Sequence, residues 1–259
     1  AILKHILRTT ASELRAIIDA GGSLAEARAR KDERLADIWR ILCIHLGTPP
    51  EKFDWQWEDK DGKFHRRGTL TPQEFAAEYV ELDLEDYVCI VNDPRNEYYR
   101  TYTVDFLQNV AGGPPVIYLN VPSSEMKDIT QKLLEDGMPV WMGCDVGKQM
   151  HRQRGLWDAK LFDFAELYGT EFRMNRADRL RFGQTMMTHA MLFTGVDVVD
   201  GKPRRWRVEN SWGAKDSGEK GYYTMNDSWY DEYMFEIACP SAYLSDEMSA
   251  GLDLSLIHR

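Results

Sequence analysis

The spacing of apolar residues changes along the chain, and this change limits the possible folds more than any other feature. In the first fifty residues, apolar side chains recur every three or four positions, the period of a helix that buries one face. The first stripe stops at Gly21-Gly22, and a second follows a capping-box pattern, Ser23 to Glu26, and ends at Gly47. The sequence therefore predicts a hairpin of two helices over residues 2–46.

The rest of the chain favours strands, with fewer helices between them. Residues 53–57 alternate apolar and polar side chains, and a polar turn leads to a return strand over residues 63–70. A short helix is expected from the Thr71 cap to Val80, and another from Ser123 or Ser124 to Gly137. The further expected strands are 87–91, 116–121, 140–144, 187–199, 205–210, 221–225 and 233–237. A helix-rich first half followed by an antiparallel β second half indicates an α+β fold.

Charge and hydropathy exclude several classes of protein. The chain has 32 Lys and Arg against 42 Asp and Glu, a formal net charge of -10, which argues against sequence-independent binding of nucleic acid. No apolar run approaches the roughly 18 residues of a membrane helix, so we expect a soluble globular protein without membrane attachment. The chain starts without Met and without a signal-peptide pattern, and we interpret it as a portion of something longer.

The cysteines point to a reducing compartment. Cys43, Cys89, Cys144 and Cys239 lie far apart and show no C-x-x-C spacing, which argues against a zinc site and against a disulfide scaffold. We therefore expect a cytoplasmic protein with no metal and no cofactor.

One histidine of the six differs from the others. His189 lies within an expected strand among small or apolar neighbours, where its ring needs a specific polar partner. Asn210 ends the next expected strand, and Asp200-Gly201 between them predicts a tight hairpin that brings the two side chains together. An imidazole held by an amide oxygen suits a thiol nucleophile, and Trp212 is placed to shield that hydrogen bond from water. The alternative is that His189 and Asn210 are ordinary polar residues of two strands, with no catalytic role.

The sequence segments around these residues resemble those of a known family. The segments Thr188-His189-Ala190-Met191 and Glu209-Asn210-Ser211-Trp212-Gly213 are similar to the His and Asn-Ser-Trp-Gly blocks of papain-like cysteine peptidases, in the bleomycin hydrolase and aminopeptidase C branch. Further matching blocks extend the resemblance from about Leu42 to Ile237. It implies a papain-like fold, amide hydrolysis as a cysteine-type aminopeptidase, and a cytoplasmic homohexamer. By the same resemblance, His189 is the catalytic base, Asn210 orients it and Trp212 supports the pair.

The resemblance also implies three regions. Residues 1–137 form a helix-rich subdomain with family insertions, residues 138–237 a β subdomain that carries the catalytic His and Asn, and residues 238–259 a divergent C-terminal tail.

The nucleophile is the main departure from the family pattern. Relatives carry a Gln and then a Cys-Trp pair near the N-terminus, and none of the four cysteines here has that setting. Cys144 is the candidate to replace the missing nucleophile. The neighbouring Asp145 would, however, raise the pKa of its thiol, so we interpret Cys144 as a buried structural residue. We therefore expect no nucleophile in this chain and no activity of the chain alone.

Three interpretations stay open. The first is the larger, C-terminal part of a cysteine aminopeptidase that acts on peptide and aminoacyl amide bonds. The second is a catalytically silent papain-like subunit that binds peptides or oligomerises. The third, a metal-dependent hydrolase, is disfavoured because His189 has no second metal ligand at suitable spacing on its strand.

Overall fold

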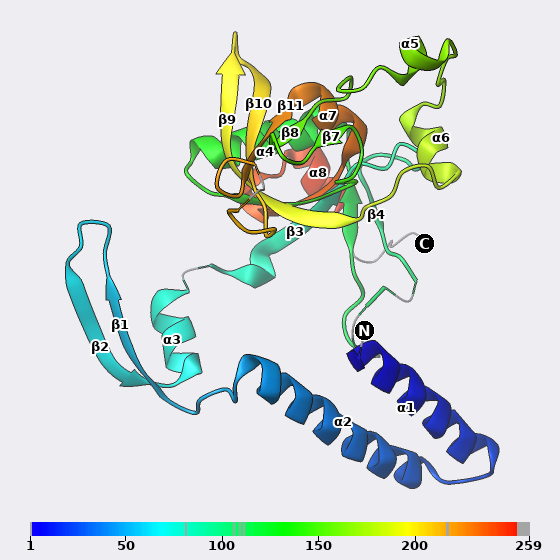
Figure 1. Ribbon diagram of the computed structural model, residues 1–259, viewed down its shortest axis with the longest axis vertical. Coiled ribbons are helices and arrows are strands. Elements are labelled where there is room, and N and C mark those ends of the chain that lie inside the picture. Colours follow the sequence, from blue (N-terminus) through cyan, green and yellow to red (C-terminus); the bar gives the residue numbers. More distant parts are fainter. Residues whose placement is uncertain are drawn as a thin grey trace. The chain divides into compact units, whose positions relative to one another are not determined.

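The computed structural model describes residues 2–80, 82–105, 107–108, 110, 112–215 and 218–252 (Figure 1). The chain divides into two compact units, Ala1–Leu82 and Asp83–Arg259, each of which is described by itself. The division after residues 137 and 237, drawn from secondary-structure content and family resemblance, remains a prediction.

The first unit begins with the expected pair of helices. Helix α1 spans Ile2–Asp19 and helix α2 spans Leu24–Leu46. The predicted capping box is present: the Glu26 backbone N–H donates to Ser23 Oγ at 3.2 Å, and the Ser23 backbone N–H donates to the Glu26 carboxylate at 2.7 Å. No helix in the described part of the chain is long and apolar enough to cross a membrane.

A carboxylate joins the two helices. Glu13 of α1 accepts hydrogen bonds from Arg34 at 2.6 Å and from Arg30 at 2.9 Å, both on α2. These guanidinium groups, Arg34 first, lower the pKa of Glu13 to about 2. These ion pairs link the two helices beside half-buried apolar side chains, and Thr10 is the one buried residue described on α1.

The first unit continues with a hairpin and a short helix. Strands β1 (Phe53–Glu58) and β2 (Phe64–Leu70) pair antiparallel, and α3 (Pro72–Tyr79) follows them. Trp55 packs edge-on against Phe75 with ring centroids 4.9 Å apart, so aromatic side chains join the hairpin to the helix. All three elements were expected from the sequence.

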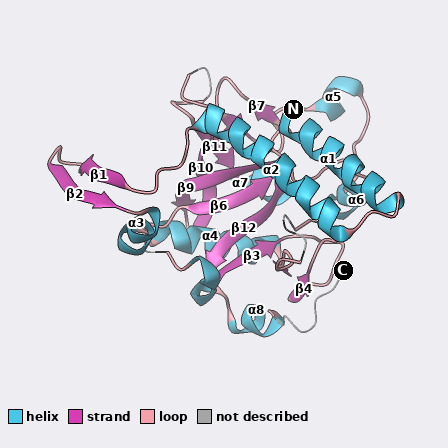
Figure 2. Ribbon diagram, turned by 90° about the horizontal axis from the view of Figure 1, so that it is seen from below, coloured by secondary structure: helices cyan, strands magenta, loops and turns pink. Residues whose placement is uncertain are grey.

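The second unit is built on a ten-stranded sheet. In spatial order the strands are β4, β5, β3, β12, β6, β9, β10, β11, β8 and β7 (Figure 2). Their bounds are β3 (Tyr87–Val91), β4 (Arg100–Tyr102), β5 (Tyr118–Asn120), β6 (Val140–Cys144), β7 (Met150–His151), β8 (Leu156–Trp157), β9 (His189–Val199), β10 (Lys202–Glu209), β11 (Tyr222–Asn226) and β12 (Met234–Pro240). The pairs β3–β5 and β8–β11 are parallel, and the other seven pairs are antiparallel in the registers described.

Helices complete this second unit and confirm the α+β class. They are α4 (Ser123–Glu135), α5 (Phe164–Tyr168), α6 (Arg176–Arg181), α7 (Asp227–Tyr233) and α8 (Asp246–Gly251), with short 3₁₀ turns at Leu84–Asp86 and Ser241–Tyr243. Helix α4 contacts β6, β9 and β12 near the middle of the sheet. Its apolar side and the sheet enclose the core, whose largest fully buried side chains include Trp157, Trp206, Trp229, Phe193 and Tyr230.

Two local expectations were wrong. Helix α4 is capped by Pro122, not by a serine: Ser123 is already helical, and its hydroxyl donates to the Asp231 carboxylate at 3.2 Å. Tyr233 ends α7 instead of opening a strand, so β12 starts one residue later. Strands β4, β7 and β8 were not predicted, because two or three residues are too few to show a period of two.

Candidate active site

Strands β9 and β10 bring His189 and Asn210 together. They form an antiparallel hairpin that turns at Asp200-Gly201, where both residues have positive φ, 50° and 75°, as the predicted tight turn requires. The register pairs Leu192 with Glu209, so Asn210 follows the end of β10 and lies diagonally across from His189, the first residue of β9. Diagonal neighbours on one face of a hairpin are close enough for side chains to touch.

The two side chains form the predicted hydrogen bond. His189 Nε2 lies 3.0 Å from Asn210 Oδ1, and Asn210 is 8% exposed. Because an amide oxygen can only accept, this contact places a proton on Nε2 and leaves Nδ1 as the nitrogen that can exchange a proton with another group. The buried Asn210 Nδ2 has no acceptor among the described residues, so the amide is held chiefly through its oxygen.

Trp212 covers this pair. Its ring centroid lies 5.1 Å from that of His189 at an interplanar angle of 30°, and 6.0 Å from that of Tyr223 at an interplanar angle of 83°. The Arg152 guanidinium carbon lies 4.8 Å from the same indole centroid. A large, partly buried ring in this position limits the access of water that would compete for the His–Asn hydrogen bond.

A buried carboxylate anchors the segment that leads into His189. Asp145, 4% exposed, accepts hydrogen bonds from Thr185 Oγ1 at 2.8 Å and from the Met186 backbone N–H at 3.3 Å. Thr188 adds a contact at 3.4 Å to the same carboxylate, and its backbone N–H donates to the Cys144 carbonyl at 2.9 Å. No local sequence pattern predicts this role, because the partners are about forty residues apart.

Three of the four cysteines have environments that do not favour a thiolate. Cys144 pairs with His189 across β6 and β9 but is completely buried, and this burial, with Asp145 nearby, raises the pKa of its thiol, in agreement with its expected structural role. Burial also raises the pKa of Cys89 to about 11 and that of Cys239 to about 12. Cys43 lies on α2 in the first unit.

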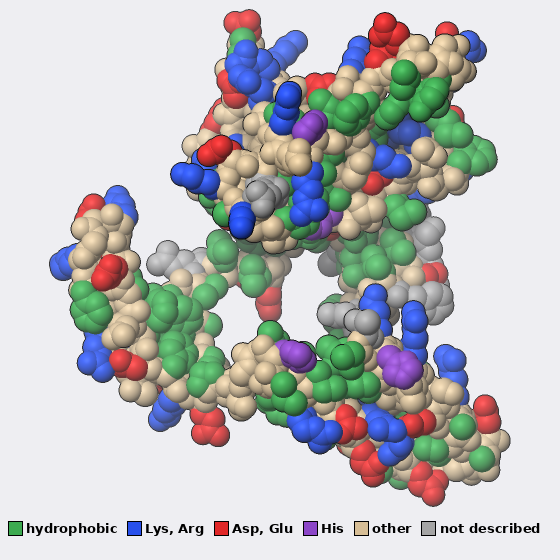
Figure 3. All heavy atoms as spheres, viewed as in Figure 1, with side chains coloured by type: hydrophobic (Ala, Val, Ile, Leu, Met, Phe, Trp, Pro, Cys, Tyr) green, Lys and Arg blue, Asp and Glu red, His purple; other side chains and the backbone are tan. Residues whose placement is uncertain are grey.

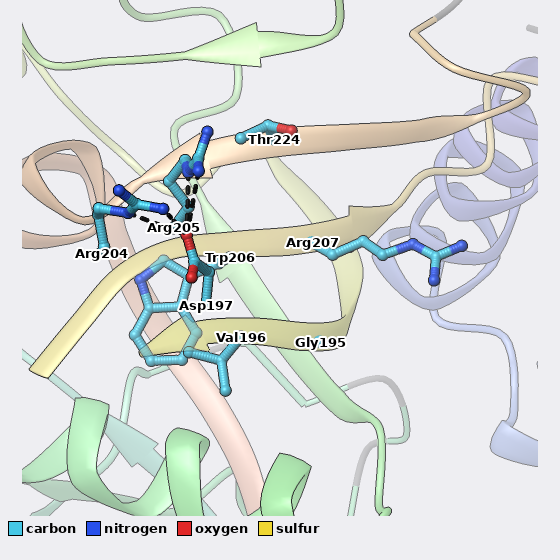
Figure 4. Close-up of a pocket in the computed structure, with 8 residues that line it drawn as sticks. All are labelled: Gly195, Val196, Asp197, Arg204, Arg205, Trp206, Arg207 and Thr224. Carbon is cyan, nitrogen blue, oxygen red and sulfur yellow. Dashed lines mark hydrogen bonds and ion pairs between the residues drawn. The ribbon is translucent and has the colours of Figure 1, made fainter. Parts of the chain in front are cut away.

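In the part of the chain that the structure describes, neither a metal site nor the surface depression involves His189 and Asn210. Within the described residues, no group of three or more His, Cys, Asp or Glu side chains is arranged to hold a metal ion. A shallow depression of about 470 Å³ lies on β9, β10 and β11, where Arg204 and Arg205 both donate to Asp197 Oδ2 (Figure 4). It includes none of the predicted catalytic residues, and in Figure 4 the Arg207 side chain points away from this ion cluster.

The fold and these blocks define the class of the protein. The family described as "Peptidase C1-like family" matches residues 1–258, and the chain belongs to it. A crystal structure of PepW from Lactobacillus rhamnosis HN001 superposes with a TM-score of 0.91 and 42% identity, over 97% of this chain and 56% of that one. The predicted papain-like fold is thereby confirmed.

Two groups of named relatives make the assignment more specific. The chain is 41% identical over 260 residues to human bleomycin hydrolase, covering 97% of this chain and 57% of that protein. It is 40% identical over 253 residues to aminopeptidase C of Lactobacillus delbrueckii subsp. lactis, covering 97% of this chain and 56% of that protein. The resemblance to this branch of cysteine peptidases is confirmed, and the chain spans a little over half the length of these relatives.

Proposed function

We propose that this chain supplies the general base and its orienting residue to a cysteine-type aminopeptidase that hydrolyses peptide and aminoacyl amide bonds. The observation that carries the proposal is the 3.0 Å contact between His189 Nε2 and Asn210 Oδ1 beneath Trp212. It leaves His189 Nδ1 to exchange the proton, while Asn210 fixes the ring as an uncharged partner. The relatives named bleomycin hydrolase and aminopeptidase C support the same reaction class.

The reaction proceeds in two halves. A cysteine gives its proton to His189, and the thiolate attacks the carbonyl carbon of the amide bond. As the tetrahedral intermediate collapses, the C–N bond breaks and the protonated imidazole gives its proton to the leaving amine. Water then attacks the thioester with His189 accepting its proton, which releases the carboxylic acid and regenerates the thiol.

We propose that the thiolate comes from a segment outside this sequence. Cys89, Cys144 and Cys239 have pKa values raised by burial, which disfavours the thiolate form. None of the four cysteines, Cys43 included, follows the Gln and precedes the Trp of the family's nucleophile block. The chain alone should therefore turn over aminoacyl amides no faster than background.

Complementation tests this proposal. The 259-residue chain is co-expressed with the N-terminal segment of human bleomycin hydrolase that carries the Cys-Trp block, and an aminoacyl fluorogenic amide is the substrate. We expect turnover that a thiol alkylator abolishes, and a loss of about a thousandfold in His189→Ala. The matched control is His45→Ala, an exposed histidine on α2, which should leave the rate unchanged.

The outcomes separate the cysteine aminopeptidase from the catalytically silent subunit. A complex that forms and binds peptide but shows no alkylator-sensitive turnover would support the catalytically silent subunit. Turnover by the chain alone would overturn the proposed origin of the thiolate, and Cys144→Ser would be the first variant to make.

We further propose that the complete enzyme is a cytoplasmic homo-oligomer, a hexamer as in the family. The four cysteines are free, which fits a reducing compartment. Light scattering on the complemented complex measures the assembly directly, and a monomeric mass would contradict the hexamer.

A further inference from the structure

Arg152 places a cation beside the candidate catalytic pair. Its guanidinium carbon lies 4.8 Å from the Trp212 ring centroid, and the His189 ring lies 5.1 Å from the same centroid. These distances put the guanidinium carbon at most about 10 Å from the imidazole centroid, which is about one Debye length at an ionic strength of about 0.1 M. The residue is exposed, and no carboxylate among the described residues forms an ion pair with it.

The backbone that carries Arg152 is held firmly. The turn over residues 152–155 joins β7 to β8, and the Arg152 carbonyl accepts hydrogen bonds from Gly155 N–H at 3.1 Å and Gly218 N–H at 3.4 Å. The Gly155 carbonyl in turn accepts from the Thr224 N–H of β11 at 2.8 Å. A Cβ on Gly155 would lie 2.6 Å from Gly218 Cα, so the turn packs too closely for a larger residue. A side chain on such a clamped turn starts from a fixed position, which favours specific recognition.

The chemistry of the proposed reaction supplies an anion near this cation. In a peptide cleaved at its first bond, the leaving portion carries the C-terminal carboxylate. His189 must come within about 3 Å of the leaving nitrogen to protonate it. In a dipeptide, the carboxylate carbon lies about 2.5 Å from that nitrogen through two covalent bonds. The carboxylate carbon thus lies within about 5.5 Å of the imidazole, closer than the upper limit of about 10 Å for the Arg152 guanidinium.

We propose that Arg152 is a specificity-determining residue that binds the C-terminal carboxylate of a short peptide substrate. This inference rests on the function proposed above. The guanidinium lies over the indole ring, and a planar guanidinium in such a position can form two parallel hydrogen bonds to a carboxylate. The enzyme would then prefer dipeptides with a free carboxylate over the same dipeptides with an amide end. The alternative is that Arg152 only packs on Trp212 and stabilises the turn.

The kinetic test compares Ala-Leu with Ala-Leu amide in the complemented complex. We expect kcat/KM for the free carboxylate to exceed that for the amide by about tenfold, and we expect Arg152→Gln to abolish this preference. Arg152→Lys should retain only part of the preference, because Lys keeps the positive charge but lacks the planar pair of N–H donors. The matched control is Arg154→Gln, which removes the same charge from the same exposed turn and should retain the full preference.

A binding test does not depend on turnover. The 259-residue chain, labelled with ¹⁵N-tryptophan, is titrated with leucine and with leucinamide while the Trp212 indole signal, assigned by Trp212→Phe, is followed. Leucine alone should shift this signal in the parent chain, and neither compound should shift it in Arg152→Gln. Equal responses to both compounds, no response to leucine, or an unchanged kinetic preference in Arg152→Gln would overturn the inference. Loss of all turnover together with a leucine-specific shift would instead refute the proposed function and leave the carboxylate site standing.

Discussion

Glu236 should make the stability of the second unit depend on pH. It lies on β12 between β3 and β6, 4% exposed, paired in register with Val91 and Gly143. Burial raises the pKa of its carboxyl group from the ordinary 4.5 to about 7, although a hydrogen bond with Cys89 opposes the rise. No ion pair of Glu236 is found among the residues that the structure describes.

The size and sign of this effect follow from proton linkage. The folded state binds the proton of Glu236 more tightly than the unfolded state, so the contribution to stability is full below about pH 4.5 and is lost as the pH rises through about 7. A rise from 4.5 to about 7 corresponds to about 3 kcal/mol, at 1.36 kcal/mol for each pH unit. Relaxation around the buried carboxylate reduces this figure. We therefore expect the free energy of unfolding to fall by about 2 kcal/mol between about pH 5 and pH 8.

The assay is urea unfolding of the parent chain and of Glu236→Gln at both pH values. The neutral, similarly shaped Gln should remove the dependence, so the variant should be about 2 kcal/mol more stable than the parent at pH 8 and close to it at pH 5. Glu209→Gln, an exposed residue of β10, controls for the loss of one carboxylate. Equal losses of unfolding free energy in the parent and in Glu236→Gln between the two pH values would show that Glu236 does not cause the pH dependence.

Two further predictions concern the candidate site. Asn210→Ala in the complemented complex should lower kcat by about ten- to a hundredfold with a smaller effect on KM, because the His189 ring loses its orienting acceptor. Steady-state kinetics measures this, and an unchanged kcat would contradict it. Asp145→Asn should cost about 1–3 kcal/mol in urea unfolding, because the buried carboxylate accepts from Thr185 and the Met186 N–H; a change below about 0.5 kcal/mol would show that this anchor is unimportant.

The sequence predicted what depends on neighbours along the chain. The capping box at Ser23 and the Asp200-Gly201 turn are local signals, and the turn fixes the hairpin register that brings His189 to Asn210. The Asp145 anchor and the position of Arg152 over Trp212 could not be predicted, because each joins residues far apart in sequence. The Pro122 cap was missed for a similar reason, since the Ser123 hydroxyl is engaged by Asp231 on α7.

The segment from residue 162 to residue 187 should make the isolated chain self-associate. It includes α5 and α6, and Figure 3 shows hydrophobic side chains on the visible surface there. Leu167, Tyr168, Phe172 and Phe182 are each about two-thirds exposed or more, at 66–71%. Burying one such side chain stabilises an association by about 1.5–3 kcal/mol. A few of these side chains in contact across two molecules can therefore offset much of the free-energy cost of association.

Light scattering against concentration, with binding of a hydrophobic dye, measures this association. The double variant Phe172→Glu, Phe182→Glu should shift the association to about tenfold higher concentration and reduce dye binding, because it places two charges within the apolar surface. The matched control is Leu7→Glu with Ile18→Glu, two exposed apolar positions on α1, which separates an effect of this segment from one of the first helix. A chain that stays monomeric and binds no dye at high concentration would show that these exposed side chains do not form an adhesive surface.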